Sequence, residues 1–368
     1  MNPLEEKVAA EIRRRGPIPF AEVVEAALYD PAHGFYATGG TAGRRGDFLT
    51  SPEVGPLFGS VLARALDTWW DELGRPDPYL VVDAGAGPGT LARAVLAASP
   101  GCAPALRYVL VERSAALRDR HREHLPLAHV AHAFVPATHG PIVVSLAELP
   151  RVDGPVVVLA NELLDNLPFG LAEWRAESGW REVRVALTDE EDRLVAVTIP
   201  LGSDEARLLD RLVPEPPAGC RVPIQRVAAQ WLRDALDLTT EGGHVVVIDY
   251  ASTTADLARR PWTEWVRTYR AHERGGHPLQ DLGRQDITCQ VAIDRLAALR
   301  QPTSERSQSE FLAAFGLDEL VAEGRRIWAE RAHIGDLAAV RARSRVGEAA
   351  ALTDPAGLGT FRVLEWAR

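Results

Sequence analysis

A glycine-rich turn and carboxylates that follow apolar runs are the parts of this 368-residue chain that could do chemistry. The turn reads Val82-Asp83-Ala84-Gly85-Ala86-Gly87-Pro88-Gly89-Thr90 and separates an apolar run from a helix-prone run. Glycines let the backbone turn sharply and let a cofactor lie against the main chain. Glu112 closes the next apolar run, where a carboxylate can accept both hydroxyls of an adenosine ribose. These residues together predict a site for an adenosine-containing cofactor.

The spacing of the three glycines is G-x-G-x-G, whereas a dinucleotide fingerprint requires G-x-G-x-x-G. Thr90 stands where the third glycine of that fingerprint belongs, and Pro88 removes an N–H from the start of the helix. S-adenosylmethionine (SAM) has no phosphate, so the pattern favours SAM over NAD. Asp83 can then face the amino group of the methionine part. Two alternatives stay open: an NAD-linked oxidoreductase, and a purely structural turn with a surface glutamate.

A second candidate site follows the apolar run 156–160 and contains Asn161, Glu162 and Asp165. Ligands of open α/β sheets bind outside the carboxyl ends of the strands, so this segment is expected beside the cofactor. Two carboxylates there could hold a cationic methyl acceptor. A structural interpretation has equal weight with acceptor binding: Asn161 would cap a helix, and Glu162 would complement the dipole of that helix. His272 and His277 are weaker candidates for a base, because isolated histidines in polar loops are usually only solvated.

The elements that must position these residues read as a parallel sheet. Continuous apolar runs are typical of strands buried on both faces, and they occur at 79–82, 106–111, 142–144, 156–159 and 245–248. Helices are expected between them at 89–98, 114–124 and 225–238. The alternation predicts an α/β fold with a doubly wound, Rossmann-like sheet. A last strand, 361–364, is expected at or near an edge.

Four regions are expected along the chain. Residues 1–78 form N-terminal helices (4–15, 19–28 and 54–73) and a long ordered loop, 29–53. Residues 79–170 form the first part of the core. Residues 171–224 form an insertion with a small antiparallel sheet, because 182–185 and 194–197 alternate between apolar and polar residues. Residues 225–368 complete the core, with a second long loop at 251–290 and helices over most of 291–346.

Composition narrows the function classes. A net charge of −10 argues against a nucleic-acid partner. The three cysteines, Cys102, Cys220 and Cys289, are far apart and predict neither a disulfide framework nor a metal site. No apolar run approaches the ~18 residues of a membrane helix, and we expect no membrane partner. The N-terminus has no signal-peptide pattern, so a cytoplasmic location is expected. Association of two copies is left open.

Several motifs then resemble one family, the MidA-like SAM-dependent methyltransferases, which include a mitochondrial complex I assembly factor that methylates a protein arginine. Residues 45–53, R-G-D-F-L-T-S-P-E, resemble the family's G-D-F-x-T-S-P-E, and 161–168 resemble N-E-x-L-D-A-L-P. Further matches are D-P-A-H-G-F-Y at 30–36, I-D-Y at 248–250 and D-I-T at 286–288. The resemblance implies a SAM-binding core and a protein arginine acceptor. It also implies that a loop closes over the cofactor, with these residues: Gly46, Asp47, Phe48, Thr50, Ser51 and Pro52.

The acceptor is the part that the sequence leaves open. Asn166 and Ala251 depart from the family pattern, and 251–290 matches poorly before Asp286. A loop there is expected to contact the acceptor, which can therefore differ from the mitochondrial one. Two alternatives remain beside protein methylation: a small-molecule acceptor, and a SAM-binding assembly factor without catalysis. For the G-D-F loop, the alternative is an N-terminal cap that only packs.

Overall fold

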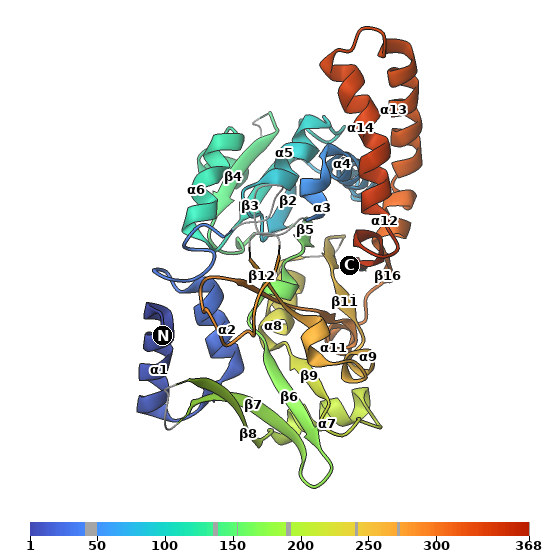
Figure 1. Cartoon of the computed structure of the whole chain (residues 1–368). Helices are drawn as coiled ribbons and strands as arrows, with labels where there is room; N and C mark the ends of the chain where they lie inside the picture. Colours follow the sequence, from blue (N-terminus) through green and yellow to red (C-terminus); the bar gives the residue numbers. More distant parts are fainter. Residues whose placement is uncertain are drawn as a thin grey trace.

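A seven-stranded sheet forms the centre of the computed structural model, which describes residues 1–40, 50–134, 139–152, 154–188, 193–239, 242–270 and 273–367 (Figure 1). The strands in spatial order are β16 (Ser304–Ser307), β17 (Arg362–Ala367), β10 (His244–Asp249), β5 (Val156–Asn161), β2 (Tyr79–Ala84), β3 (Leu106–Val111) and β4 (Ile142–Leu146). From β10 to β4 all neighbours are parallel, whereas β17 runs antiparallel to both β10 and β16. The predicted α/β fold is confirmed, and β17 lies one strand from an edge.

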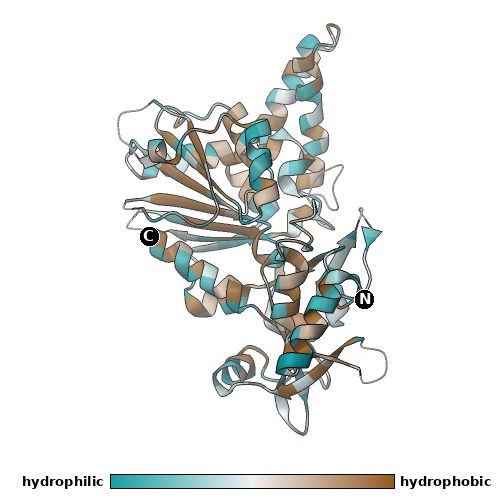
Figure 2. Cartoon of the chain, turned by 90° about the vertical axis from the view of Figure 1, so that its left-hand side faces the viewer, coloured by the Kyte–Doolittle hydropathy of each residue, from teal (hydrophilic) through white to brown (hydrophobic). Residues whose placement is uncertain are grey.

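Helices cover both faces of this sheet because its strands carry apolar side chains on both sides. Val81 and Val82 of β2 point to opposite faces, and both are fully buried. One face packs against α4 (Pro56–Glu72), α5 (Thr90–Ala97), α12 (Gln308–Ala314) and α13 (Leu317–Arg331). The other face packs against α8 (Arg226–Leu238) and α11 (Ile293–Leu299). Figure 2 shows the central strands as hydrophobic along their length, as expected for a sheet buried between helices.

A second, antiparallel sheet contains the insertion. Its strands are β6 (Gly170–Arg175), β7 (Gly179–Leu187), β8 (Leu194–Pro200), β9 (Arg221–Ile224) and the short β1 (Ile18–Pro19). Helix α7 (Ser203–Leu212) lies between β8 and β9 in the chain and packs through Leu209 against the same sheet. Because β1 pairs with β7, the N-terminal segment is part of this sheet.

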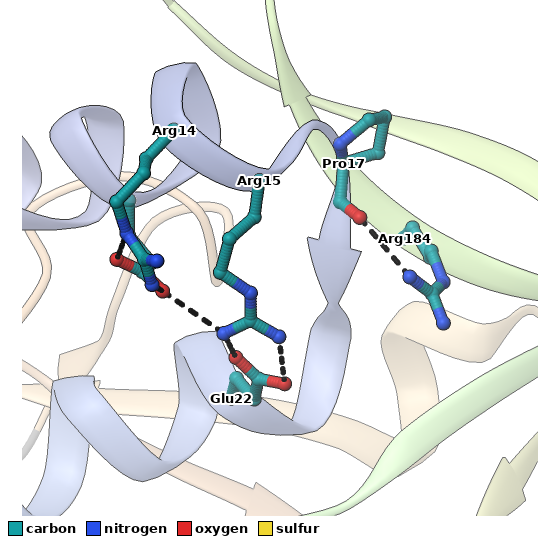
Figure 3. A network of polar contacts seen from close by, with 6 residues as sticks. Arg14, Arg15, Pro17, Glu22 and Arg184 are labelled. Atoms are coloured by element: carbon teal, nitrogen blue, oxygen red, sulfur yellow. Dashed lines mark hydrogen bonds and ion pairs between the residues drawn. The ribbon is translucent and has the colours of Figure 1, made fainter.

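The N-terminal helices α1 (Pro3–Arg15) and α2 (Phe20–Tyr29) share an apolar core with the insertion, and polar contacts join the two helices to each other and the segment between them to β7. Arg15 at the end of α1 pairs with Glu22 of α2 at 2.8 Å (Figure 3). Arg184 of β7 donates to the carbonyl of Pro17 at 3.1 Å. The segment after α2 therefore begins at a fixed position, and Phe35 and Tyr36 within it are buried.

One expectation for the C-terminal half was wrong. Residues 251–290 do not form one long loop, because they contain short elements that a periodicity search over longer windows misses. These elements are β11 (Ala251–Ser252), α9 (Thr254–Ala258), α10 (Trp262–Trp265), β12 (Val266–Arg270), β13 (Glu273–Arg274) and β14 (Asp286–Cys289). The expectation that helices fill most of 291–346 is confirmed, and β16 adds an edge strand of polar residues among them.

A helical hairpin projects from the body of the protein. Helices α13 and α14 (Leu337–Leu352) pack against each other and extend beyond the central sheet (Figures 1 and 2). The remaining elements are β15 (Val291–Ala292), α3 (Ser51–Val54), α6 (Ala115–His124) and three 3₁₀ turns, Val130–Phe134, Leu164–Asn166 and Leu358–Thr360. Within the described ranges, no helix has the length and apolar character needed to cross a membrane.

Candidate active site

A cavity of about 930 Å³ lies at the carboxyl ends of β2, β3 and β5. The predicted cofactor residues that line it are Thr50, Pro52, Asp83, Gly85, Gly87, Glu112 and Asn161. Ser51 and Gly89 adjoin lining residues, whereas Gly46, Asp47 and Phe48 lie outside the described residues. The position of the cavity agrees with the rule that open α/β sheets bind ligands at this edge. Direct contact of each residue with a cofactor stays a prediction.

The glycine turn depends on its glycines for different reasons. Gly85, Gly87 and Gly89 have φ angles of 72°, 54° and 84°. Residues that carry a side chain rarely adopt such positive φ angles, whereas glycine adopts them readily. A Cβ at Gly85 would also approach the Leu163 side chain to 2.8 Å. At Gly87 a Cβ would meet nothing within 4 Å, so only the backbone conformation requires glycine there.

The N–H groups of this turn are already used within the protein. Gly85 and Ala86 donate to the carbonyl of Val111 and Gly89 donates to that of Ala86. Gly87 donates to Glu112 Oε2 at 3.0 Å, and Pro88 has no N–H. A phosphate-binding turn needs N–H groups directed at the ligand. This turn therefore suits a cofactor without phosphate, as the spacing of its glycines predicted.

Glu112 directly follows β3 and links the turn to the next helix. Its Oε1 accepts from Ser114 N at 2.7 Å, and its Oε2 accepts from Gly87 N. Each carboxylate oxygen can accept a second hydrogen bond, so both remain able to receive ribose hydroxyls. Burial raises the pKa of Glu112, and the two backbone donors act in the opposite direction.

His121 of α6 holds the other side of the turn, a role that the sequence did not reveal. Its Nε2 lies 2.7 Å from the carbonyl oxygen of Gly87, and its Nδ1 lies 2.9 Å from Ser145 Oγ. A carbonyl only accepts, so Nε2 carries the proton and Nδ1 accepts from the Ser145 hydroxyl. Burial lowers the pKa of His121, which agrees with a neutral ring. Gly87 is thus fixed through both its N–H and its carbonyl.

Asp83 ends β2 and is 3% exposed. The Tyr108 hydroxyl donates to its Oδ2 at 3.1 Å. Burial raises the pKa of Asp83 to about 7, although the hydrogen bond from Tyr108 opposes that shift. A buried carboxyl that lines a cavity gains most from a cationic ligand, since the ligand replaces the lost hydration.

The turn after β5 is not the start of an α-helix, so the helix-cap interpretation of Asn161 and Glu162 is wrong. Glu162 has a φ of 53°, which is uncommon for a residue with a side chain, and only the 3₁₀ turn Leu164–Asn166 follows. Asn161 Nδ2 donates to Glu162 Oε1 at 3.2 Å, and Ser51 N donates to the same oxygen at 2.8 Å. Burial raises the pKa of Glu162 to about 7. Strained backbone of this kind is often found at functional sites.

Two carboxylates from distant elements join this turn, and sequence analysis gave them no role. Asp249 at the end of β10 accepts from Leu164 N at 2.8 Å and from Asp165 N at 3.4 Å. Asp286 of β14 accepts from Asn166 Nδ2 at 3.1 Å and from the Tyr36 hydroxyl at 3.1 Å. Their only signal in the sequence was their presence in the I-D-Y and D-I-T motifs.

Asp165 does not lie where its spacing from Glu162 suggested. Glu162, Leu163 and Asn166 line the cavity, whereas Asp165 is not part of the described wall. The Oδ1 of Asp165 is buried and has no hydrogen-bond partner among the described residues. Burial and the neighbouring Asp249 raise the pKa of Asp165 well above its usual value. Asp165 therefore stands behind the wall as part of a group of four carboxylates, Glu162, Asp165, Asp249 and Asp286.

The segment before α4 connects the glycine turn with the turn after β5. Thr50 and Pro52 line the cavity, and Ser51 N donates to Glu162. Glu53 Oε1 accepts from Thr90 Oγ1 at 2.6 Å, and Ser51 Oγ donates to Gln308 at 2.9 Å. This part of the predicted covering loop is therefore held at the cavity as well as packed against the core.

The two histidines considered as bases are not in this group. His277 packs its ring against Trp262 and accepts from Leu279 N, away from the described cavity wall. His272 lies outside the described residues. No group of three or more histidine, cysteine or acidic residues in the described ranges is arranged to hold a metal ion.

Comparisons with known proteins agree with the geometry. The family described as "Putative S-adenosyl-L-methionine-dependent methyltransferase" matches residues 61–311. The protein arginine methyltransferase NDUFAF7, mitochondrial, of Homo sapiens is 28% identical over 352 residues, covering 86% of this chain and 74% of that protein. The Mus musculus protein of the same name is 27% identical over 355 residues, with 86% and 75% coverage. A crystal structure from Burkholderia thailandensis, bound to S-adenosyl-homocysteine, matches with a TM-score of 0.80 and 27% identity, covering 99% of this chain and 92% of that one.

Proposed function

The chain belongs to the family of S-adenosyl-L-methionine-dependent methyltransferases whose profile matches residues 61–311, and we propose that its acceptor is an arginine side chain of a partner protein. The observation that carries this proposal is the group of four carboxylates beside the cavity. Among the described residues, no lysine or arginine forms an ion pair with Glu162, Asp165 or Asp249. A guanidinium group in the cavity would supply a positive charge to Glu162, the member of the group that lines the wall. The NDUFAF7 relatives, which carry arginine methyltransferase in their names, support the same acceptor.

The residues of the cavity fit the cofactor. SAM carries a sulfonium and an ammonium group, and Asp83, Glu112 and Glu162 supply carboxylates with raised pKa values around it. When bound, SAM supplies a methyl group on a leaving group that departs without a proton. The protein then has to orient the acceptor and exclude water. Residues at the ends of β2 and β3 would hold the cofactor, and Glu162 would face the acceptor.

Glu162 is suited to handle the proton of an arginine acceptor. The hydrogen bonds from Ser51 and Asn161 both end on Oε1, which leaves Oε2 to accept from a guanidinium N–H. Guanidinium is protonated in water and loses a proton when a nitrogen is methylated and the product returns to its charge state. A carboxyl whose pKa is about 7 can take that proton at neutral pH. Asp249 positions the turn through Leu164 N and does not itself face the acceptor.

Mass spectrometry of partners captured with this protein tests the proposed acceptor. The protein is incubated with cell extract and with SAM that carries an isotopically labelled methyl group. We expect the label on arginine nitrogen of one or a few captured proteins. Label on small molecules alone would favour the small-molecule alternative. Capture that depends on SAM without any transfer would favour the assembly factor.

Affinity for SAM is expected to rise between about pH 6 and 8 because Asp83 then becomes charged, whereas the charge that Glu162 gains over the same range serves the acceptor. Burial raises both pKa values from 3.8 and 4.5 to about 7, so the folded protein binds more protons than the unfolded chain between those limits. The ligand-free protein therefore loses this contribution to stability as pH rises through about 7. Melting temperatures measured with and without SAM over this pH range test both the expected rise in SAM affinity and the expected loss of stability of the ligand-free protein. A ligand-induced shift that does not change with pH would contradict this assignment.

Two further expectations stay predictions. A cytoplasmic location agrees with three free, buried cysteines, whereas the curated relatives are named as mitochondrial proteins. Association of two copies is likewise a prediction, and sedimentation of the purified protein would decide it.

A further inference from the structure

The projecting hairpin of α13 and α14 carries an open groove that is separate from the candidate active site. The groove has a volume of about 580 Å³, and residues of both helices line it, among them Arg325, Trp328, Val340, Arg343, Val346 and Gly347. Of the seven large apolar side chains that are exposed among the described residues, four lie on this hairpin: Ile334, Leu337, Val340 and Val346. Exposed apolar surface gathered in one place marks an interaction site. We call this feature the hairpin groove.

The shape of the hairpin groove suits a third helix. Leu337, Val340 and Gly347 follow one another at spacings of three and seven, which places them on one face of α14. At 1.5 Å per residue, this stretch is about 15 Å long, the length of a helix of about three turns. The backbone groups inside two helices are already paired, so they offer no edge to an extended peptide. An amphipathic helix pairs its own backbone and can lay its apolar face in such a groove.

Gly347 leaves room for this helix. It lies inside α14, where glycine is less favourable than alanine. A Cβ at Gly347 would meet nothing within 4 Å, so no contact of the described chain requires a glycine there. Gly324 of α13 differs, because a Cβ there would lie 2.7 Å from the carbonyl oxygen of Ala342 on α14. Gly324 thus serves the packing of the hairpin, whereas Gly347 faces open space in the groove.

The charge of the hairpin groove favours an acidic occupant. Three carboxylates of the hairpin are paired with other arginines: Glu323 with Arg345, Glu330 with Arg326 and Asp336 with Arg331. Among the residues that the structure describes, neither Arg325 nor Arg343 forms an ion pair, and Arg343 lies over the ring of Trp328 at 5.1 Å. A second copy of this chain fits poorly, because contact between two identical grooves would bring four arginines together.

The base of the hairpin is joined to the segment that borders the active-site cavity. Glu348 of α14 accepts from Leu57 N of α4 at 2.8 Å. Gln308 donates to the carbonyl of Leu352 at 3.0 Å and accepts from Ser51 Oγ at 2.9 Å. Ser51 lies between two residues of the cavity wall. A protein bound in the hairpin groove would therefore be held at a fixed position relative to the cavity.

We propose that the hairpin groove is a docking site for a helix of a partner protein whose apolar stripe is flanked by acidic residues. Trp328, Val340 and Val346 contact the apolar stripe, and Arg325 and Arg343 pair with the flanking carboxylates. This inference goes beyond the proposed arginine acceptor and does not depend on it, because docking requires no methyl transfer.

Two synthetic peptides of opposite charge test the groove. The acidic probe is a helix of about four turns, held helical by a hydrocarbon staple, with leucines along one face and glutamates beside them. The basic probe has lysine in place of each glutamate. Because the protein has a net charge of −10, nonspecific attraction would favour the basic probe. We expect the acidic probe to bind at least about tenfold more tightly and to protect residues 325–347 from hydrogen exchange.

Reversing the charge of the groove should reverse this preference. The double change Arg325→Glu and Arg343→Glu is expected to weaken the acidic probe at least about tenfold and to strengthen the basic probe. Arg326→Glu with Arg341→Glu is the matched control, because it makes the same change in net charge on the same two helices outside the groove wall. The control should still prefer the acidic probe.

Gly347→Gln tests the groove without removing a charge. Glutamine is a better helix former than glycine, and its Cβ meets nothing in the chain, so the melting temperature should rise. The longer side chain occupies the space that the partner helix needs, and the acidic probe should bind about fivefold or more weakly. A more stable variant that binds less tightly cannot be explained by unfolding.

Other occupants of the groove would give different results. Absence of binding by the acidic probe, or equal binding of both probes, would overturn the proposal. A dimer that Gly347→Gln dissociates in sedimentation would overturn it in favour of a second copy. Binding to phosphatidylglycerol vesicles that requires Arg325 and Arg343, with no binding of the acidic probe, would overturn it in favour of a membrane surface. Absence of labelled arginine in the capture experiment would contradict the proposed function and leave the docking site standing.

Discussion

Glu162→Gln is expected to slow methyl transfer by at least about 100-fold while SAM binds within about threefold of its original affinity. The glutamine keeps the volume of the side chain, and its amide oxygen can still accept from Ser51 N and Asn161 Nδ2. The change removes the negative charge that would orient the guanidinium and the atom that would take its proton. Single-turnover transfer and calorimetry with SAM measure the two quantities on the same preparation.

A structural role for Glu162 would give the opposite pattern. If the side chain only fastens Ser51 to the end of β5, the glutamine variant should melt at a lower temperature and transfer methyl at an unchanged rate per folded molecule. Glu323→Gln on α13 is the matched control, because that glutamate lies outside the cavity wall and pairs with Arg345 on the hairpin. Asp165→Asn should have a smaller effect than Glu162→Gln, since Asp165 stands behind the wall.

Glu112→Ala is expected to weaken SAM binding about 10- to 150-fold, which corresponds to about 1.5–3 kcal/mol for lost charge-assisted hydrogen bonds. The alanine removes the acceptor of the ribose hydroxyls and also leaves Gly87 N and Ser114 N without their carboxylate. Calorimetry with SAM and with S-adenosyl-homocysteine should show the same loss for both, because the ribose is common to them.

Glu112→Gln separates the two consequences of that change. The glutamine can keep one backbone hydrogen bond and most of the shape of the turn, but it lacks the charge. The SAM affinity of Glu112→Gln should lie between those of the original protein and the alanine variant. Its melting temperature should be close to that of the original protein. Unchanged SAM affinity in a folded Glu112→Ala protein would show that the cofactor lies elsewhere in the cavity.

The sheet and the glycine turn were predictable because their signals are local. Runs such as Tyr79–Ala84 are apolar at nearly every position, which only a strand buried on both faces requires. The glycines of the turn and Glu112 lie within one short stretch of strand, turn and helix, so their roles could be predicted from neighbouring residues alone. The edge strand β16 gave no such signal, because Ser304–Ser307 contains no apolar residue.

The carboxylate group was only partly predictable because it is assembled from distant elements. Glu162 and Asp165 were found by their position after an apolar run. Asp249 and Asp286 arrive from β10 and from β14, which lies in a region expected to be a loop. The left-handed backbone of Glu162 was equally hidden, since an asparagine and a glutamate at the start of a segment usually indicate a helix cap. That conformation decides that Glu162, and not Asp165, lines the cavity.

The most direct test of the arginine-acceptor proposal is the amount of methylarginine formed in a purified client protein per S-adenosyl-homocysteine released. The client is the protein identified by capture, and SAM carries a labelled methyl group. We expect one labelled methyl on an arginine nitrogen for each S-adenosyl-homocysteine formed by the unchanged protein, and neither product from Glu162→Gln above background. S-adenosyl-homocysteine formed without methylarginine, or equal methylation by the glutamine variant, would contradict the account.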